Sequence, residues 1–186
     1  MYTVCKMSHR LPADYQVDFQ KLEHSLATAS EGDLHKAIVN TPFTETVQMA
    51  LLRLGITVLL LVNEENQTLD RIALSDTEMA KGSTRYSMKR FNDIRIPMSS
   101  PENILVKAVR TGEPEFVSDW SHMFVPELTP SQARLNQASA GIGTSAIYPF
   151  RNGAMIFSFF SEPGAITDAH RDFMRRYIDL VTKYLS

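Results

Sequence analysis

Cysteine is nearly absent from this sequence, which has one, Cys5, in 186 residues. A single thiol excludes a disulfide framework, a zinc site built from cysteines and a redox centre of two cysteines in one chain. The same scarcity suits a reducing compartment. An excess of charge of one sign is also missing, because 19 lysines and arginines balance 21 acidic residues. That balance argues against an extended nucleic-acid-binding surface, which is usually strongly basic.

Long apolar runs are missing as well. The longest, residues 50–62, contains Arg53 and Gly55 and is too short to span a bilayer. Residues 1–11 include basic side chains but no apolar core, so they do not form a signal peptide. Apolar residues make up 44% of the chain and charged residues 22%, which is typical of a globular domain. We therefore expect a cytoplasmic protein with no nucleic-acid partner and no membrane partner.

The chain divides into a leader, a helical segment and a larger domain. Residues 1–13 form the predicted leader, and residues 14–32 form an N-terminal helical segment. Asp14 is suited to cap a helix that runs to about Ala29. Apolar residues at helical spacing form one stripe on this helix: Tyr15, Phe19, Leu22 and Leu26. We expect the stripe either to pack within the chain or to pair two chains across a two-fold axis.

Local signals locate the other helices. A capping side chain followed by proline or an acid favours the first turn of a helix, and glycine favours its end. The predicted helix starts are Asp33, Ser100-Pro101-Glu102, Thr129-Pro130 and Thr167-Asp168, with a third segment or a kink at Thr41-Pro42. The predicted helix ends are Gly55, Gly112 and Gly141.

Extended segments account for much of the rest. Ile56–Val62 is β-branched and apolar on both faces, which predicts a strand whose two faces are both covered. Asn152-Gly153 is a strong hairpin signal, and residues 76–92 are predicted to be a loop. The predicted strands are residues 56–62, 69–74, 94–96, 115–117, 144–150 and 154–160. This order predicts an α+β fold: a central antiparallel sheet of about six strands, flanked by helices, with the N- and C-terminal helices packed together.

Three stretches, in this order and spacing, resemble the GAF domain, a small-ligand sensory module of signalling proteins related to PAS domains. They are Asn103–Pro114 followed by Phe116–Asp119, then Ser145–Phe150, and then Asn152-Gly153 with Met155–Phe160 before an amphipathic helix. The likeness covers about residues 33–185, and we assign residues 33–186 to a GAF-like domain. The resemblance implies a sheet that holds a small ligand and terminal helices that carry the signal.

The chain departs from several known types of GAF domain. Phe157 stands where the last strand often has a glycine, so its ring is expected to fill part of the usual pocket. The signature of cyclic-nucleotide-binding members cannot be placed. Cys5 lies in the leader, so a bilin attached through a Cys-His pair in the domain is not implied. The GAF-type free methionine sulfoxide reductases need several cysteines, so we expect no enzyme of that type.

Residues 119–124 are the most informative segment for ligand binding. In one interpretation Trp120 and Phe124 form the apolar wall of a pocket, with Asp119 and His122 as polar anchors. In the other, the rings plug the sheet and Asp119 caps a turn. The candidate ligand-binding residues are Trp120, His122, Phe124, Asp119, Tyr148, Phe157 and Arg90.

Arg90 belongs to a local basic cluster, which consists of Lys81, Arg85, Lys89, Arg90 and Arg95. The cluster is either an anion-binding lip or a solvated loop that protects a sheet edge. His170 lies between Asp168 and Asp172, but neighbours two apart on a helix do not share a face, so we expect an exposed histidine. We find no nucleophile, phosphate-loop or metal-ligand motif, so the sequence predicts neither catalytic residues nor a metal site.

Two functions stay open at this level. The first is a sensory or regulatory domain that binds a small ligand, whose identity the sequence does not give, and signals through its terminal helices. The second is an interaction and dimerisation module without a ligand, in which side chains fill the pocket. Both include a homodimer as the expected assembly, and the first also needs a separate output partner or segment.

Overall fold

The computed structural model describes residues 11–12, 15–160 and 165–185. The helices are α1 (Phe19–Ala27), α2 (Leu34–Asn40), α3 (Thr46–Leu52), α4 (Glu78–Gly82), α5 (Ile104–Thr111), α6 (Pro130–Ala140) and α7 (Asp168–Thr182). The strands are β1 (Leu54–Asn63), β2 (Thr68–Leu74), β3 (Arg95–Pro97), β4 (Glu115–Val117), β5 (Thr144–Phe150) and β6 (Gly153–Phe159).

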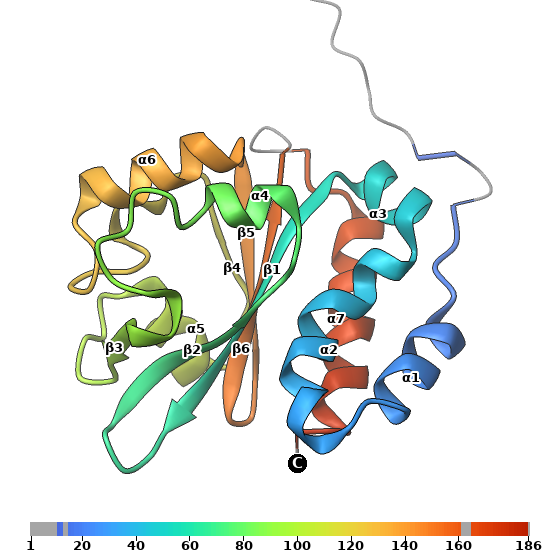
Figure 1. Ribbon diagram of the computed structural model, residues 1–186, viewed down its shortest axis with the longest axis horizontal. Coiled ribbons are helices and arrows are strands. Elements are labelled where there is room, and N and C mark those ends of the chain that lie inside the picture. The colour runs from blue at the N-terminus through green and yellow to red at the C-terminus, as the bar shows by residue number, and fades with distance from the viewer. Residues whose placement is uncertain (1–10, 13–14, 161–164, 186) are drawn as a thin grey trace, which may run out of the picture.

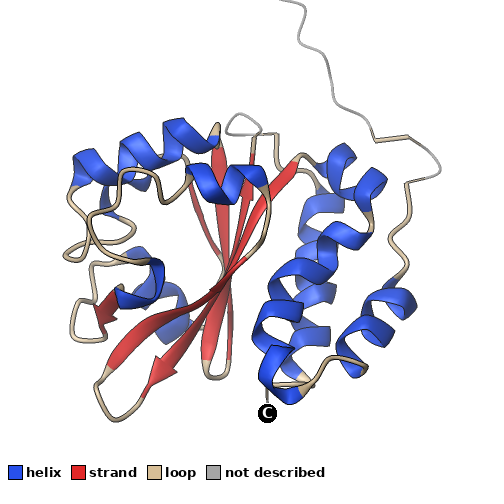
Figure 2. Ribbon diagram, in the orientation of Figure 1, coloured by secondary structure: helices blue, strands red, loops and turns tan. Residues whose placement is uncertain are grey.

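These elements form three layers (Figures 1 and 2). Across the described residues, a six-stranded antiparallel sheet runs in the order β3-β2-β1-β6-β5-β4. Helices α2, α3 and α7 cover one face, with α1 packed on their outer side, and α4, α5 and α6 cover the other. The predicted α+β class, the antiparallel sheet and its strand number are therefore confirmed.

The terminal helices pack together on one face, as predicted. The rings of Phe19 in α1 and Phe173 in α7 lie 6.1 Å apart, and Lys183 Nζ lies 3.0 Å from a carboxylate oxygen of Glu23. Leu22 and Leu26 are 0% and 1% exposed, so the apolar stripe of α1 is covered within one chain. Of the two possibilities for this stripe, the structure shows the intramolecular one.

The centre of the sheet is the pair β1 and β6, which join at a very close approach. A Cβ atom on Gly153 would lie 2.1 Å from the carbonyl oxygen of Leu60, so no side chain fits there. The backbone N–H of Val62 also donates to the carbonyl oxygen of Asn152 at 2.8 Å. The Asn152-Gly153 turn therefore closes the predicted hairpin and also brings β6 against β1.

Both faces of β1 are buried, because side chains of a strand alternate between the two faces of a sheet. Leu59 and Leu61 pack with the terminal helices, whereas Val58 and Leu60 pack with α4, α5 and α6. The prediction that the terminal helices cover the second face is confirmed. The two cores that result are called the helix-side core, with α1, α2, α3 and α7, and the loop-side core, with α4, α5 and α6.

The start of α1 corrects the predicted cap. Asp14 lies outside the described residues, and residues 15–18 are not helical. The side chain of Asp18 accepts a hydrogen bond from the backbone N–H of Lys21 at 3.1 Å, so α1 begins at Phe19. Tyr15 therefore precedes the helix, because the side chain of Asp18 accepts the bond from a free N–H of the first turn.

The start of α5 is also later than predicted. The side chain of Asn103, and not Ser100, accepts from the backbone N–H groups of Leu105 and Val106. The same amide donates to the carbonyl oxygens of Met123 and Val125 at 3.1 Å. The amide of Asn103 has two N–H donors besides its acceptor oxygen, so it can cap the helix and hold a distant segment by two bonds, whereas a hydroxyl has one donor.

The structure also contains a helix that was not predicted, and it ends another helix earlier than expected. The supposed loop 76–92 contains α4, capped by Thr77, whose hydroxyl accepts from the N–H of Ala80 at 3.1 Å. Helix α3 ends at Leu52, and Arg53 takes the left-handed conformation with φ of 57°, so Gly55 already lies in β1. Thr41-Pro42 begins a 3-10 turn, Thr41–Thr44, between α2 and α3.

His170 is buried, which overturns the predicted exposed position. Its side chain is 5% exposed, its Nε2 lies 3.0 Å from the carbonyl oxygen of Leu52, and its Nδ1 accepts from the N–H of Thr167. These bonds require a proton on Nε2 and none on Nδ1. Helix α7 presents this side chain to the end of α3, a contact that spacing along one helix does not reveal.

Among the described residues, no helix combines the length and apolar character that crossing a membrane requires.

Replacement of Leu60 by alanine tests the central strand. Leu60 is 0% exposed, so its truncation should lower the free energy of unfolding by about 2–5 kcal/mol. Leu135→Ala on α6, where the leucine is 51% exposed, serves as the control and should cost less than about 0.5 kcal/mol. Equal losses in denaturant melts of the two variants would show that β1 is misplaced.

The pH dependence of stability tests the buried histidine. Burial lowers the pKa of His170 below its ordinary value of 6.5. The unfolded chain then binds the proton more readily, so the free energy of unfolding should fall as the pH drops below 6.5. His170→Gln should flatten this slope between pH 7.5 and 5.5 in urea melts, whereas His24→Gln, at an exposed position, should keep it. An unchanged slope in His170→Gln would contradict the buried neutral imidazole.

Candidate functional site

Arg71 is a buried charge in the loop-side core. It lies two residues after Leu69 on β2, so both side chains leave the sheet on the same face. Leu69 is 0% exposed and Arg71 is 4% exposed. The alternation of the strand thus carries a guanidinium to a position that normally holds an apolar side chain.

This guanidinium has no anionic partner among the described residues. No carboxylate there comes within ion-pair distance, and its Nε has no hydrogen-bond acceptor. The adjacent Asp70 accepts instead from Thr68 and Asn63, at 2.6 and 3.2 Å. Burial lowers the pKa of Arg71 to about 9, so the group is still a cation at neutral pH.

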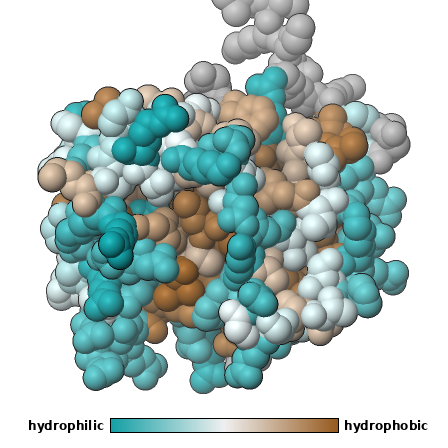
Figure 3. Space-filling view, in the orientation of Figure 1, coloured by the Kyte–Doolittle hydropathy of each residue, from teal (hydrophilic) through white to brown (hydrophobic). Residues whose placement is uncertain are grey.

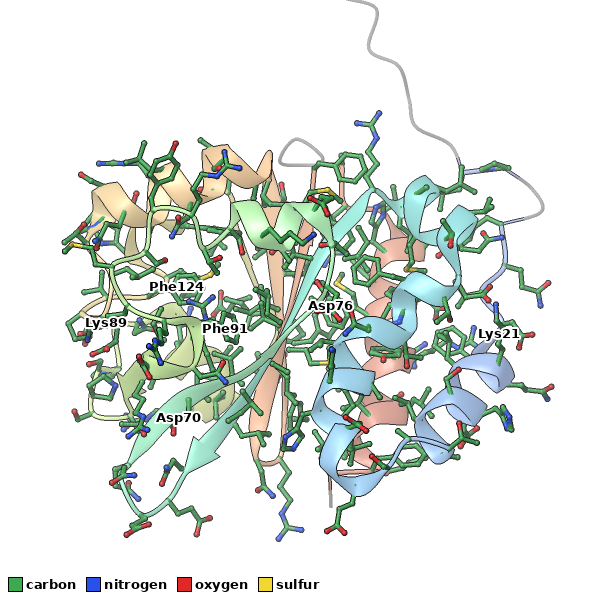
Figure 4. The ribbon with its side chains drawn as sticks, viewed as in Figure 1. Lys21, Asp70, Asp76, Lys89, Phe91 and Phe124 are labelled. Atoms are coloured by element: carbon green, nitrogen blue, oxygen red, sulfur yellow. The ribbon has the colours of Figure 1, made fainter. Side chains whose placement is uncertain are left out.

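Two aromatic rings contact the cation. The guanidinium carbon of Arg71 lies 3.9 Å from the ring centre of Phe91 and 4.7 Å from that of Phe124. Figure 4 shows these two phenylalanines on the loop side of β2. Such contacts contribute about 0.5–2 kcal/mol each, whereas burying an ion costs several kcal/mol. The rings therefore offset only part of the cost of the buried charge.

The two rings come from separate segments that are tied to α6 and to each other. Phe91 opens a 3-10 turn, Phe91–Asp93, at the end of segment 83–93. The side chain of Asn136 in α6 accepts from the N–H of Tyr86 and donates to Ser87, both at 2.7 Å. Lys89 pairs with Glu127 at 2.5 Å, three residues beyond Phe124. Few bonds hold segment 83–93 in place over Arg71.

A line of side chains continues from Arg71 across the sheet. The rings of Phe124 and Trp120 meet edge to face with centres 6.2 Å apart. The indole N–H of Trp120 donates to the hydroxyl of Ser145 at 2.9 Å, and Ser145 lies 2.8 Å from the hydroxyl of Ser158. We call this line, from Arg71 through Phe124, Trp120 and Ser145 to Ser158, the Arg71–Ser158 row.

The row is closed in this structure. Trp120 and Phe124 are 4% and 5% exposed, and Met123 between them is 1% exposed. Figure 3 shows apolar atoms at the surface between hydrophilic side chains of the α4–α6 layer and those of the β1–β2 hairpin. Access from solvent to the row therefore requires movement of a covering side chain.

Of the candidate residues predicted in segment 119–124, the structure buries two and exposes two. Trp120 and Phe124 belong to the row, whereas Asp119 and His122 are exposed. Asp119 accepts from the N–H of Ser121 at 2.8 Å and caps the 3-10 turn Trp120–His122. The bonds from Ser121 lower the pKa of Asp119. Asp119 thus has the turn-capping contact of the second interpretation.

Tyr148 and Phe157 lie on the other face of the sheet. Their rings meet edge to face at 6.1 Å, and Phe157 packs against Phe173 and Tyr177 of α7. The candidates Tyr148 and Phe157 therefore do not share one site with the candidates Trp120 and Phe124. Strand alternation is the reason, because Phe157 belongs to the helix-side core while its neighbour Ile156 belongs to the loop-side core.

The basic cluster at residues 81–95 does not converge on one site. Lys81 pairs with Glu78, Lys89 with Glu127, and Arg95 approaches Asp70 at 4.0 Å. Arg90 is exposed at the start of the Phe91–Asp93 turn. These ion pairs with separate acids match a solvated surface better than an anion-binding lip.

Sequence reasoning missed the residues at both ends of the row. Arg71 could have been found, because a charge one strand period after a buried leucine must face the core unless the strand slips. Phe91 lies in a segment predicted to be a loop, and nothing local marks its position over Arg71. Ser145 and Ser158 become a pair only through the register of β5 and β6, where they lie opposite each other.

In the described part of the chain, no group of three or more His, Cys, Asp or Glu side chains is arranged to hold a metal ion.

Comparison with known proteins shows similarity of structure only. No protein-family model matches the chain, and no curated protein matches it. The GAF domain of an Acinetobacter phosphoenolpyruvate-protein phosphotransferase superposes with a TM-score of 0.58 at 10% identity, over 88% of this chain and 87% of that one. A cyanobacteriochrome GAF domain, TePixJ, gives 0.53 at 15% identity, over 86% and 92%.

An enzyme is also among the similar structures. The free methionine-R-sulfoxide reductase of Neisseria meningitidis, in complex with its substrate, gives a TM-score of 0.53 at 13% identity, over 87% of this chain and 82% of that one. The fold therefore does not separate a sensor from an enzyme. The layer order, the sheet and these superpositions agree on one conclusion: this chain has the GAF fold.

Proposed function

We propose that this chain is a GAF-like sensory or regulatory domain, which binds a small ligand at the Arg71–Ser158 row and signals through its terminal helices. The observation that carries the proposal is the buried guanidinium of Arg71, whose Nε has no partner. Buried charges in folded proteins are usually paired, so an unpaired one is a candidate for ligand recognition.

The surroundings of Arg71 support a binding site. Ligand sites are mostly apolar and contain few polar groups that fix orientation. The row has this composition, since Phe91 and Phe124 contact one cation, and Trp120 links Phe124 to the serine pair. Segment 83–93 is the element that would move when a ligand enters.

The central strands offer a route from the row to the terminal helices. In β6, Ser158 and Ile156 face the loop side, whereas Phe157 and Phe159 face α7. A ligand that shifts β6 would therefore alter the packing of Phe173 and Tyr177 on the other face. Signalling would follow as a population shift, provided that the ligand prefers one arrangement of these helices.

The alternative is a ligand-free interaction module. It is favoured by the close packing of Trp120, Met123 and Phe124, which fill the loop-side core in this structure. Such a module still has to bury the guanidinium of Arg71. The loss of hydration costs free energy, and the two aromatic contacts on this face offset only part of it. We therefore place the ligand-binding function first.

The remaining parts of the proposal concern chemistry and partners. We propose a protein that is not an enzyme, because the single cysteine leaves no second thiol for a reductase of the Neisseria type, as judged from the resemblance. A cytoplasmic location, a homodimer and a separate output protein complete the proposal. A dimer would use surfaces other than Leu22 and Leu26, which are buried within the chain.

Native mass spectrometry of freshly purified protein tests whether a ligand binds. The native ion should carry an additional small mass that is lost on denaturation. Because Trp120 is the only tryptophan, its emission should change when that molecule is removed and returned. An unmodified native mass, with Trp120 emission and melting temperature unchanged by a panel of small metabolites, would instead favour the ligand-free module.

A further inference from the structure

We infer that the Arg71–Ser158 row takes a small organic monocarboxylate with an apolar body, whose carboxylate pairs with the guanidinium of Arg71. The inference rests on the proposed function, since it names the chemical class of that ligand. It goes further because it assigns the recognising atoms and excludes neutral, cationic and strongly anionic ligands.

The free hydrogen-bonding capacity of Arg71 is the first reason. Phe91 and Phe124 lie beside the guanidinium carbon and offer no hydrogen-bond acceptor. The Nε–H group is buried and unpaired. A carboxylate suits this group, because its two oxygens match two N–H groups along one edge of a guanidinium.

The charge available in the row is the second reason. The side chains of Lys89 and Arg95 are exposed and have acidic partners, Glu127 and Asp70. Arg71 is thus the one cation that the described residues place inside the row. A single negative charge would neutralise it, whereas a dianion would bring an uncompensated charge into an apolar core.

The lining of the row is the third reason. Leu60, Leu69 and Ile94 are each 0% exposed in the loop-side core that surrounds Arg71. The rings of Phe124 and Trp120 extend this apolar surface toward the serine pair. The ligand therefore needs an aliphatic or aromatic body beside its carboxylate, because a small polar acid would leave its polar groups without partners.

Phe91 is the side chain through which such a ligand would enter. It lies 3.9 Å from the guanidinium and is half-buried, and its neighbours Arg90 and Asn92 are exposed. The ring could swing away with segment 83–93 while Phe124 stays packed against Trp120. Phe91→Ala should then speed up binding and leave the preference for carboxylates unchanged.

Matched acids and amides test the chemical class. The probes are phenylacetate and 3-methylbutanoate, the amide of each, and inorganic phosphate, with the melting temperature and Trp120 emission as readouts. We expect each carboxylate to raise the melting temperature, because a ligand that binds the folded state stabilises it. The amides and phosphate should leave it unchanged.

Substitution of Arg71 tests the assigned residue. Arg71→Met should melt at or above the temperature of the unsubstituted protein without ligand, because it removes an unpaired buried charge. It should also lose the response to carboxylates. Arg85→Met, at an exposed arginine outside the row, should keep that response. A full response to carboxylates in Arg71→Met would overturn the inference. The inference would also fail if Arg71→Met melted several degrees lower and the unsubstituted protein did not respond to carboxylates.

A measurement on the unsubstituted protein covers the case in which Arg71→Met does not fold. One arginine Nε–H signal should exchange slowly with solvent in NMR spectra, and it should shift with carboxylates but not with their amides. An Nε–H signal that no carboxylate shifts would count against the inference. A neutral or cationic molecule retained in native mass spectra would refute the monocarboxylate and leave the sensory function standing. Failure of every probe together with an empty native ion would refute both.

Discussion

The close pairing of β1 with β6 is the contact on which the rest of the structure depends. Gly153 lets β6 approach β1 so closely that a Cβ atom would lie 2.1 Å from the carbonyl oxygen of Leu60. Both strands are therefore central in the sheet and covered on both faces. An apolar strand without polar alternation is stable only in such a position. A layer of helices is therefore needed on each face of the sheet to cover β1 and β6.

The two faces of the sheet have different chemistry, although they share the same strands. The helix-side core contains apolar contacts together with buried hydrogen bonds that hold α7. The hydroxyl of Tyr177 donates to the carbonyl oxygen of Ile38 at 2.6 Å, and His170 bonds to that of Leu52. The loop-side core contains the Arg71–Ser158 row, with its unpaired cation. The unpaired cation on the loop side is the feature on which the proposed ligand response rests.

The GAF fold of this chain does not determine its function. The structures that superpose on this chain include GAF domains of a phosphotransferase and a cyanobacteriochrome, and a free methionine-R-sulfoxide reductase. The elements that determine the superposition are the sheet and the covering helices, which would be the same in either case. Arg71, Phe91 and the serine pair are side-chain features, so the proposed function rests on these residues and not on the fold.

The sequence by itself determined the α+β class, the strand order along the chain and most helix ends, because periodicity, caps and turn glycines act over a few residues. Gly112 and Gly141 end α5 and α6 as predicted, and Thr129 caps α6. The tertiary structure decided the rest, because partners far apart in the chain compete for the same groups. Asn103, and not Ser100, caps α5, and its amide also donates to the carbonyl oxygen of Met123. His170 is buried, and its ring bonds to the carbonyl oxygen of Leu52. The same limit applies to the site: local pattern marked Trp120 and Phe124, whereas only the sheet register and the fold of segment 83–93 brought Arg71, Phe91 and the serines together with them.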